Sequence, residues 1–270
     1  MSVKLFEGEE HAKIYSQSRP GYPKELIERI IDFVRVTEYD SSSLAIDVGC
    51  GNGQVTHLFS PYFDRIYGFD VSENQIKEAR RMSKNEKVSF FVSPSETLPL
   101  ERETTSLITV ATAIHWFNIE AFFAECDRIL KPNGVLAIFL YDLPTITHSP
   151  ALSAFQDKLN EIYKYLRPYF AKEFEIYEQK YKTLKPPFKE IERDILFKNE
   201  IKWRVEHLLS FIQSLSGYQT FHAKNPENNF IHSTREEIYN LFKQLNCAEN
   251  VESVEFTVNF EVTLILCRKC

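Results

Sequence analysis

The sequence lacks any apolar run of the roughly 18 residues that a membrane-spanning helix needs. Its first ten residues also lack the apolar core of a secretory signal peptide. The 43% apolar and 26% charged fractions are typical of a globular protein and exclude a disordered chain. We therefore expect a folded protein of the cytoplasm that has no membrane partner.

The chain has no excess of basic residues. Its 32 lysines and arginines stand against 38 aspartates and glutamates, which leaves a net charge of -6. A protein that binds nucleic acid needs a basic patch for the phosphates, so this balance disfavours a nucleic-acid partner. A small molecule or a peptide remains as the expected partner.

Cysteine is also scarce. The five cysteines are odd in number and scattered, which predicts reduced thiols. Cys267 and Cys270 have the spacing of half a zinc site, but no second half with ligand spacing follows from the sequence. We expect no metal site, and we expect these last residues to form a frayed tail.

What the sequence does contain is a short apolar run that ends in an acid and three glycines, at residues 44–53. The apolar part is typical of a buried parallel strand, and the glycines predict a tight turn where a ligand can approach the backbone. The Gly-x-Gly-x-Gly spacing differs from the Gly-x-Gly-x-x-Gly dinucleotide fingerprint. A second apolar run ends at Asp70. Its separation from the glycine turn is close to the roughly 20 residues after which an acid meets ribose hydroxyls. Together they predict a site for a nucleoside-like cofactor.

Helical and strand patterns alternate over the first 140 residues. An amphipathic helix is predicted from residue 23, and Ser72 opens a capping box for another. Apolar strands are predicted at residues 88–92, 106–111 and 135–140. Because strands and helices alternate, the fold class is α/β, with a doubly wound, mostly parallel, Rossmann-like sheet.

The alternation stops after residue 144. Helical stripes at residues 152–166 and 205–215 predict a helical cap inserted after the fifth strand, and a capping box at Ser233 predicts a last sheet-covering helix. The alternating pattern of residues 251–267 predicts edge strands at the end of the chain. We expect an arm and cofactor-binding core over 1–144, a substrate cap over 145–232, and a C-terminal helix with edge strands over 233–270.

Three motifs carry a family resemblance: Asp-Val-Gly-Cys-Gly-Asn-Gly at 47–53, Gly-Phe-Asp-Val-Ser at 68–72 and Leu-Lys-Pro-Asn-Gly at 130–134. Together they resemble the class I S-adenosylmethionine-dependent methyltransferases. The resemblance implies that the cofactor is S-adenosyl-L-methionine. It also implies that the sheet has seven strands and that residues 251–267 form its antiparallel edge.

Further motifs resemble one branch of that family. They are His-Ala-Lys-Ile-Tyr at 11–15, Arg-Pro-Gly-Tyr-Pro at 19–23, Ala-Ile-His-Trp-Phe at 113–117 and, more faintly, Gly-Tyr-Gln-Thr at 217–220. They are similar to the small-molecule branch that includes the trans-aconitate methyltransferases of fungi. This implies a small acceptor, and we expect O-methylation of a carboxylate of an organic acid. The alternatives are C- or N-methylation of another small molecule, a nicotinamide-dependent oxidoreductase, or a non-catalytic cofactor-binding protein.

The resemblance also assigns cofactor contacts. Asp47 is expected to accept hydrogen bonds from the methionine ammonium, although a buried acid that caps the glycine turn is an alternative. The loop at 93–100 resembles the adenine-binding loop, where an ordinary exposed acid is the alternative for Glu96. An arm that carries Tyr15 is expected to form a lid or to pack at a domain edge. The predicted cofactor-binding residues are Asp47, Gly49, Cys50, Gly51, Gly53, Asp70, Val71, Ser95, Glu96, Ala113 and Tyr15.

The predicted acceptor site begins with His115 and Trp116, just past the fourth strand, because open α/β sheets bind ligands at the carboxyl ends of their strands. A carboxylate is already deprotonated, so we expect His115 to orient or bind the acceptor, or to be structural. Arg19 is the expected anchor of a second carboxyl group, with a structural donor or exposed residue as the alternative. The cap is expected to add Trp203, Arg204 and His222.

Overall fold

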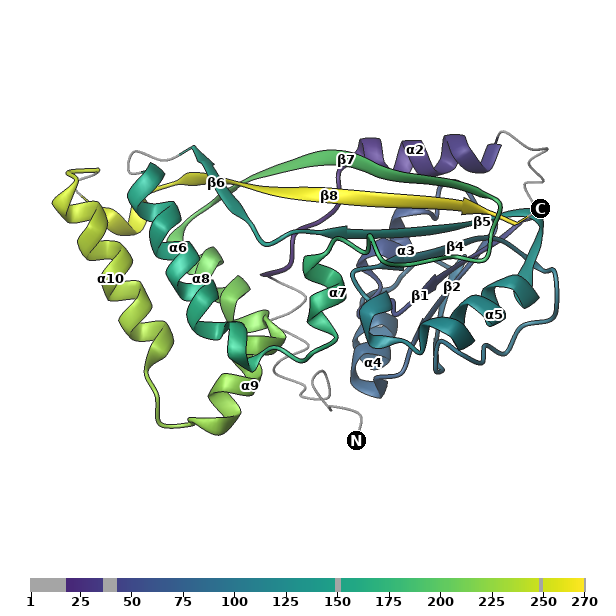
Figure 1. Cartoon of the computed structure of the whole chain (residues 1–270), viewed down its shortest axis with the longest axis horizontal. Helices are drawn as coiled ribbons and strands as arrows, with labels where there is room; N and C mark the ends of the chain where they lie inside the picture. The colour runs from purple at the N-terminus through teal and green to yellow at the C-terminus, as the bar shows by residue number, and fades with distance from the viewer. Residues whose placement is uncertain (1–17, 36–42, 149–151, 248–249, 270) are drawn as a thin grey trace. The chain divides into compact units, whose positions relative to one another are not determined.

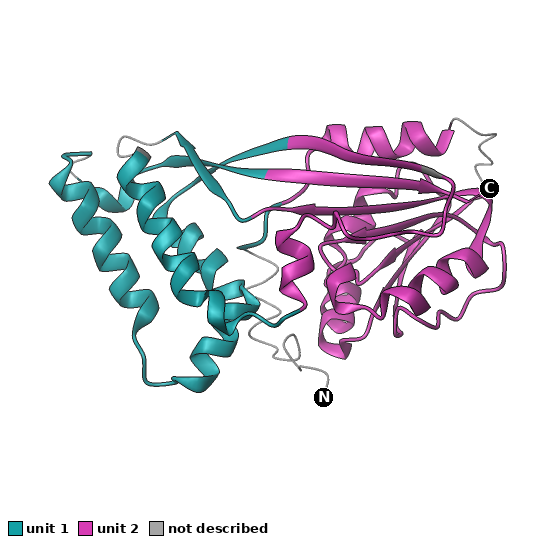
Figure 2. Cartoon of the chain, viewed as in Figure 1, with its two compact units in different colours: residues 1–20, 143–172, 198–260 teal, residues 21–142, 173–197, 261–270 magenta. Residues whose placement is uncertain are grey.

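The structure is a computed structural model that describes residues 18–35, 43–148, 152–247 and 250–269. These residues divide into two compact units, which Figure 2 colours separately. Unit 1 holds the described parts of residues 1–20, 143–172 and 198–260. Unit 2 holds those of residues 21–142, 173–197 and 261–270. Residues 173–197 of the predicted cap therefore belong to the same unit as the glycine turn.

Unit 2 contains a five-stranded parallel sheet (Figure 1). Its strands are β1 (Leu44–Val48), β2 (Arg65–Asp70), β3 (Val88–Val92), β4 (Thr105–Ala111) and β5 (Leu130–Tyr141). Their order is β3-β2-β1-β4-β5. All five side chains of β1 are buried, as expected for a central parallel strand covered on both faces.

The antiparallel end of the sheet is β8 (Phe256–Arg268), which pairs with β5 in unit 2 and with β6 (Thr145–His148) in unit 1. The full order β3-β2-β1-β4-β5-β8-β6 confirms the predicted α/β sheet with an antiparallel edge. Two details of the prediction are wrong. A single long strand replaces the several C-terminal edge strands, and an eighth strand, β7 (Glu190–Trp203), pairs with β8 where the helical cap was predicted.

The sheet of unit 2 is covered by helices. They are α2 (Lys24–Arg35), α3 (Gln54–Leu58), α4 (Glu73–Met82) and α5 (Ile119–Ile129), to which the short η1 (Ile114–Trp116) and α7 (Phe174–Glu178) are added. From β1 the chain moves to β2 and β3 on one side of the sheet, and from β4 it moves to β5 on the other side. Because both kinds of crossover are right-handed, α3 and α5 cover opposite faces of the sheet. The predicted helix cap is confirmed, since the Ser72 hydroxyl accepts a hydrogen bond from the Gln75 N–H.

Unit 1 is mainly helical. It contains α6 (Leu152–Leu166), η2 (Arg167–Tyr169), α8 (Val205–Ser214), α9 (Ser216–Lys224), α10 (Phe230–Gln244) and η3 (Val251–Ser253). Its core includes the ring of Phe155, which packs edge-on against Phe242 and Phe256 at centroid distances of 5.1 and 4.7 Å. In the part of the chain that the structure describes, no helix is long and apolar enough to cross a membrane.

Two further predictions are corrected here. Helix α10 begins at Phe230 and not after Ser233, and in the added turn the Phe230 ring stacks on Tyr165. Within unit 1 it packs on α6, α8 and η3. Cys267 is buried within β8 and pairs with Leu136, so it does not belong to a frayed tail; Cys270 lies outside the described residues.

Candidate active site

The glycine turn joins β1 to α3 and is tied to the neighbouring strand β2. Gly49, Gly51 and Gly53 all have positive φ, at 71°, 53° and 85°. The N–H groups of Gly49 and Cys50 donate to the Phe69 carbonyl at 2.8 and 3.0 Å. The left-handed backbone that glycine allows therefore closes the turn against the end of β2, as the sequence predicts.

The three glycines serve different purposes. A Cβ at Gly49 would lie 2.6 Å from the Cβ of Ala113, and a Cβ at Gly53 would lie 2.4 Å from the Phe90 ring. At Gly51 the nearest atom, Oε1 of Gln75, would be 3.8 Å away. Packing within the protein thus requires the first and third glycines. Only Gly51 has the open approach that was expected for the whole turn.

Asp70 ends β2 beside this open glycine. Its Oδ2 accepts a hydrogen bond from the Gly51 N–H at 2.8 Å, and its Oδ1 accepts one from the Ser72 N–H at 2.9 Å. Burial raises the pKa of the Asp70 carboxyl, while these backbone bonds act to lower it. Each carboxylate oxygen has a second lone pair, so Asp70 can also accept from a ligand hydroxyl.

Asp47 lies in the middle of the sheet and is fully buried. Its Oδ2 accepts from the Thr56 hydroxyl at 2.7 Å and its Oδ1 from the Thr109 hydroxyl at 2.9 Å. Burial raises the pKa of Asp47 to about 6. The two threonines were missed in the sequence, where nothing near Thr56 or Thr109 indicates that its hydroxyl reaches Asp47. This arrangement resembles the alternative of a buried acid that supports the turn.

Two buried polar atoms near the turn have no hydrogen-bond partner within the described ranges. They are Nδ2 of Asn52 and Oε1 of Gln75, and the latter is the atom nearest the open side of Gly51. Buried polar groups are normally hydrogen-bonded, so such atoms fit a site for a polar ligand. The open glycine, the carboxylate of Asp70 and these two atoms fit a cofactor with hydroxyl and ammonium groups.

The loop at residues 93–100 is clamped onto α5. Oε1 of Glu125 accepts the Leu98 N–H at 2.6 Å, and Arg128 donates to the carbonyls of Leu98 and Leu100 at 3.1 and 2.8 Å. Burial acts to raise the pKa of Glu125, but its bonds from Arg128 and Leu98 bring it below the ordinary value. Glu125 and Arg128 were missed in the sequence, although their Glu-x-x-Arg spacing on a helix is visible.

The other predicted cofactor residues have varied surroundings. Ser95 is buried, and Oε1 of the half-buried Glu96 accepts the N–H of Asn118, the N-cap of α5, at 2.8 Å. Cys50 is buried, which raises the pKa of its thiol, whereas Val71 is exposed. Ala113 packs on Gly49. Tyr15 lies outside the described residues.

His115 and Trp116 lie in η1, directly after β4. His115 is buried, and its Nδ1 lies 2.7 Å from the hydroxyl oxygen of Tyr181. The rings of Trp116 and Tyr177 are 4.9 and 5.6 Å from the imidazole. Tyr177 and Tyr181 were not predicted as site residues, because nothing in the sequence around them indicates that they return to this place.

The remaining predicted acceptor residues belong to unit 1. Arg19 donates from Nη2 to the Ser214 carbonyl at 2.9 Å and lies 5.2 Å above the Phe211 ring, which fits the structural-donor alternative. Trp203 is buried against Phe211. Two others are exposed: Arg204 pairs with Glu255 at 3.1 Å and His222 stacks on Tyr218 at 5.8 Å.

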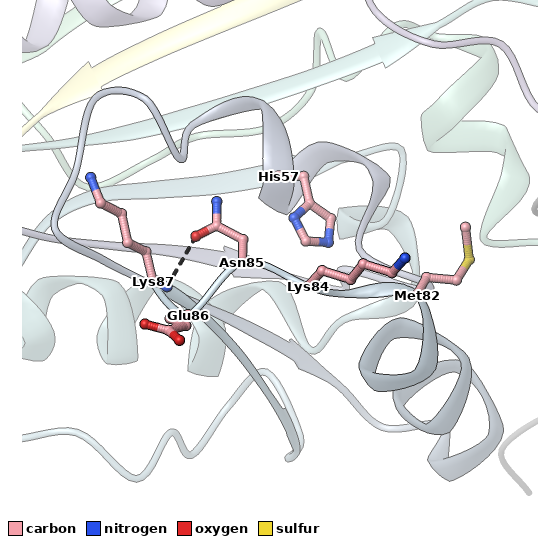
Figure 3. A pocket seen from close by; sticks show the side chains of 6 residues that line it. All are labelled: His57, Met82, Lys84, Asn85, Glu86 and Lys87. Carbon is pink, nitrogen blue, oxygen red and sulfur yellow. Dashed lines mark hydrogen bonds between the residues drawn. The ribbon is translucent and has the colours of Figure 1, made fainter.

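A separate open hollow lies at the other end of the sheet. Figure 3 shows its lining side chains, which are His57, Met82, Lys84, Asn85, Glu86 and Lys87. Lys87 directly precedes β3, so the hollow is at the amino ends of the parallel strands, whereas Gly51 and Asp70 follow the carboxyl ends. Ligands of open α/β sheets bind at the carboxyl ends, so this hollow is not part of the candidate active site.

Comparisons with known proteins agree with this geometry. Residues 46–138 match the family model of a methyltransferase domain. A Dictyostelium discoideum protein named as a methyltransferase is 31% identical over 259 residues, covering 96% of this chain and 93% of that protein. A Saccharomyces cerevisiae protein named as an S-adenosylmethionine-dependent methyltransferase is 33% identical over 156 residues, covering 56% of this chain and 50% of the yeast protein.

A solved structure shows the same fold. A protein from Anaeromyxobacter dehalogenans, described as a type II methyltransferase, has a TM-score of 0.74 and 23% identity, covering 93% of this chain and 97% of its own. The match extends over nearly the whole of both chains. In this chain the sheet that it covers has the order β3-β2-β1-β4-β5-β8-β6. The Dictyostelium protein is similar over nearly the full length of the chain, and the family model matches its core. The chain therefore belongs to the class I S-adenosylmethionine-dependent methyltransferases.

Proposed function

We propose that this methyltransferase transfers a methyl group to a carboxylate oxygen of a small organic acid. The observation that carries the proposal is the surroundings of His115, the ionisable side chain in η1 at the carboxyl end of β4. Its Nδ1 is engaged by the buried Tyr181 hydroxyl. An imidazole held in this way is suited to orienting an acceptor, and a carboxylate needs no group to remove a proton because it is ionised at neutral pH.

The bound cofactor supplies an electrophilic methyl group on a positively charged sulfur. A carboxylate oxygen that is aligned with this carbon would accept the methyl group, and the sulfur would leave as a neutral thioether. The protein therefore contributes alignment, which can lower a barrier by roughly 7–11 kcal/mol at most. We assign that task to the glycine turn, to the clamped loop at 93–100 and to η1.

On the cofactor side, we propose that Asp70 accepts hydrogen bonds from ribose hydroxyls and that Gly51 lets the cofactor approach the backbone. Asn52 and Gln75, each with a buried polar atom that lacks a partner in the described chain, supply further polar contacts. The loop at 93–100 is the proposed adenine site, since Glu125 and Arg128 fix its backbone.

On the acceptor side, we propose His115 and Trp116 of unit 2. Arg19 of unit 1 is a separate candidate by its residue type, because a planar guanidinium can donate two parallel hydrogen bonds to a carboxylate; its bond to the Ser214 carbonyl fits the structural alternative. Trp203, Arg204 and His222 are weaker candidates, because one is packed in the core of unit 1 and the other two are exposed and have partners.

The proposal can be tested with an acceptor panel. The purified protein is incubated with S-adenosylmethionine that carries a deuterated methyl group and with small carboxylic acids, phenols, amines and activated carbon acids. Mass spectrometry should find the label in acids alone, as an ester that alkali cleaves to release labelled methanol. Label only in amines or on carbon, with every acid inert, would contradict O-methylation and favour N- or C-methylation.

A further inference from the structure

Tyr181 reaches His115 from a distant part of the chain. It follows the short helix α7 (Phe174–Glu178), and both residues belong to unit 2. Both side chains are buried, and the hydroxyl oxygen lies 2.7 Å from Nδ1, a distance typical of a hydrogen bond. This contact fixes the imidazole that directly follows β4.

The backbone that presents Tyr181 adopts a conformation that side chains disfavour. Lys180 and Tyr181 have φ of 52° and 57°, in the left-handed region where glycine or asparagine usually ends a helix. Their N–H groups donate to the carbonyls of Tyr177 and Ile176 and so close the last turn. Strained residues that persist in a structure are held by their surroundings, and such residues are found at functional sites.

The side chains of Lys180 and Tyr181 both make polar contacts. The Lys180 ammonium lies 2.8 Å from a carboxylate oxygen of Asp142 and 2.5 Å from one of Glu261, while Tyr181 bonds His115. Lys180 anchors the segment to Glu261 of β8 and to Asp142, which follows β5. Tyr181 adds a polar contact to one atom of the imidazole.

A second tyrosine in the same segment provides a comparison. The Tyr177 hydroxyl donates to the Tyr141 carbonyl, and its ring lies 5.6 Å from the imidazole of His115. Like Tyr181, Tyr177 packs beside His115 and its buried hydroxyl makes a hydrogen bond. Its hydroxyl donates to the backbone, whereas the hydroxyl of Tyr181 lies against the imidazole nitrogen.

We propose that Tyr181 is a positioning residue that sets the tautomer of His115. A neutral imidazole has one donor and one acceptor nitrogen. The phenolic O–H is the more acidic of the two possible donors, so Tyr181 donates and Nδ1 accepts. The proton of His115 then resides on Nε2, which makes the side chain an N–H donor to a negatively charged acceptor oxygen instead of a base. The acceptor part of this inference rests on the proposed function.

The tautomer can be observed directly in the full chain without any ligand. The protein is labelled with ¹⁵N-histidine, and the His115 signals are identified by their loss in His115→Asn. We expect an unprotonated Nδ1 and a protonated Nε2 in the wild type and in Tyr177→Phe, and a mixture of tautomers in Tyr181→Phe. A wild-type spectrum with the proton on Nδ1 would overturn the proposal, and this result does not depend on how the two tyrosine variants fold.

Kinetics give the second measurement. Tyr181→Phe should raise KM for the acid about tenfold and leave cofactor affinity within twofold, whereas Tyr177→Phe, which keeps the ring beside the imidazole, should raise KM clearly less. Equal losses of activity and melting temperature in the two variants would show that Tyr181 only anchors its segment. If no acid is methylated at all, the proposed function fails, and the histidine spectrum still decides the role of Tyr181.

Discussion

Asp70 accepts a hydrogen bond from the N–H of Gly51 at 2.8 Å, which joins the end of β2 to the one glycine of the turn that has open space beside it. The acid at the end of the strand and the glycine turn are thus held together directly. The Ser72 N–H on the other carboxylate oxygen fixes the orientation of the group at the start of α4. The affinity for the cofactor should therefore depend on both residues.

The first prediction separates the two kinds of glycine. Gly51→Ala places a methyl group in open space, so the protein should fold with a loss of about 1–2 kcal/mol for the left-handed residue and with weakened S-adenosylmethionine binding. Gly53→Ala drives a methyl group into the Phe90 ring and should lose clearly more stability. Thermal melting and calorimetric titration measure the two effects. Normal cofactor affinity in a folded Gly51→Ala would contradict the assignment.

The second prediction concerns Asp70. Asp70→Ala should weaken binding of S-adenosylmethionine by about 1–3 kcal/mol, the cost of leaving hydrogen-bonding groups without a charged partner. Asp142→Ala is the control, because this acid also follows a strand, β5, but pairs with Lys180. A folded Asp70→Ala variant that binds as tightly as the control would refute the ribose assignment.

The third prediction is a pH effect on stability from Asp47. Its pKa of about 6 in the folded protein lies above the unfolded value of about 3.9, so the folded state binds more protons between these values. The stabilisation is complete below about pH 4 and is lost as pH rises through 6. Urea unfolding of the wild type should show a decrease of about 3 kcal/mol over this range that Asp47→Asn lacks. Equal pH slopes for the two proteins would contradict the burial argument.

The fourth prediction tests the clamp on the loop at 93–100. Glu125→Gln leaves the Leu98 N–H and Arg128 with a weaker acceptor, so cofactor affinity and melting temperature should both fall. The control is Glu78→Gln, which removes the charge from another Glu-x-x-Arg pair, where the arginine is 72% exposed against 29% for Arg128. An exposed pair contributes at most about 1 kcal/mol, so this variant should bind normally. Equal effects would show that the clamp has no role in the site.

The fifth prediction concerns Arg19 as an anchor. Arg19→Lys keeps the charge and loses the planar fork of donors, so KM for the acid should rise while cofactor affinity changes little. Arg235→Lys, at an ion pair with Glu206 in the same unit, should leave both unchanged. If Arg19→Lys lowers only the melting temperature, the bond to Ser214 is its whole role.

Much of the core could be predicted because the signals are local. The apolar run of β1, the glycines that must take positive φ and the cap at Ser72 each lie within a few residues. Strand β7 was missed in the sequence. Its residues 194–200 alternate between exposed and half-buried positions, with Ile195 and Phe197 half-buried, and it lacks the continuous apolar run of a buried strand.

The candidate site was harder to predict, because its contacts join distant segments. Nothing near Tyr181 indicates that a left-handed turn after α7 brings it to His115. Likewise, the sequence does not show that Phe90 fills the space beside Gly53 or that Thr56 and Thr109 surround Asp47. The sequence therefore predicts the residue types of the site better than it predicts their partners.

The central claim is that the cofactor's methyl group passes to a carboxylate oxygen at a site that depends on Asp70. The most direct measurement is ¹³C NMR of the reaction of S-adenosylmethionine labelled in its methyl carbon with the best acid of the panel. The wild-type protein should give a methyl ester signal, and Asp70→Ala should give it only at much higher cofactor concentration. A labelled methyl group on nitrogen or carbon, or an undiminished ester signal from Asp70→Ala at low cofactor concentration, would contradict the claim.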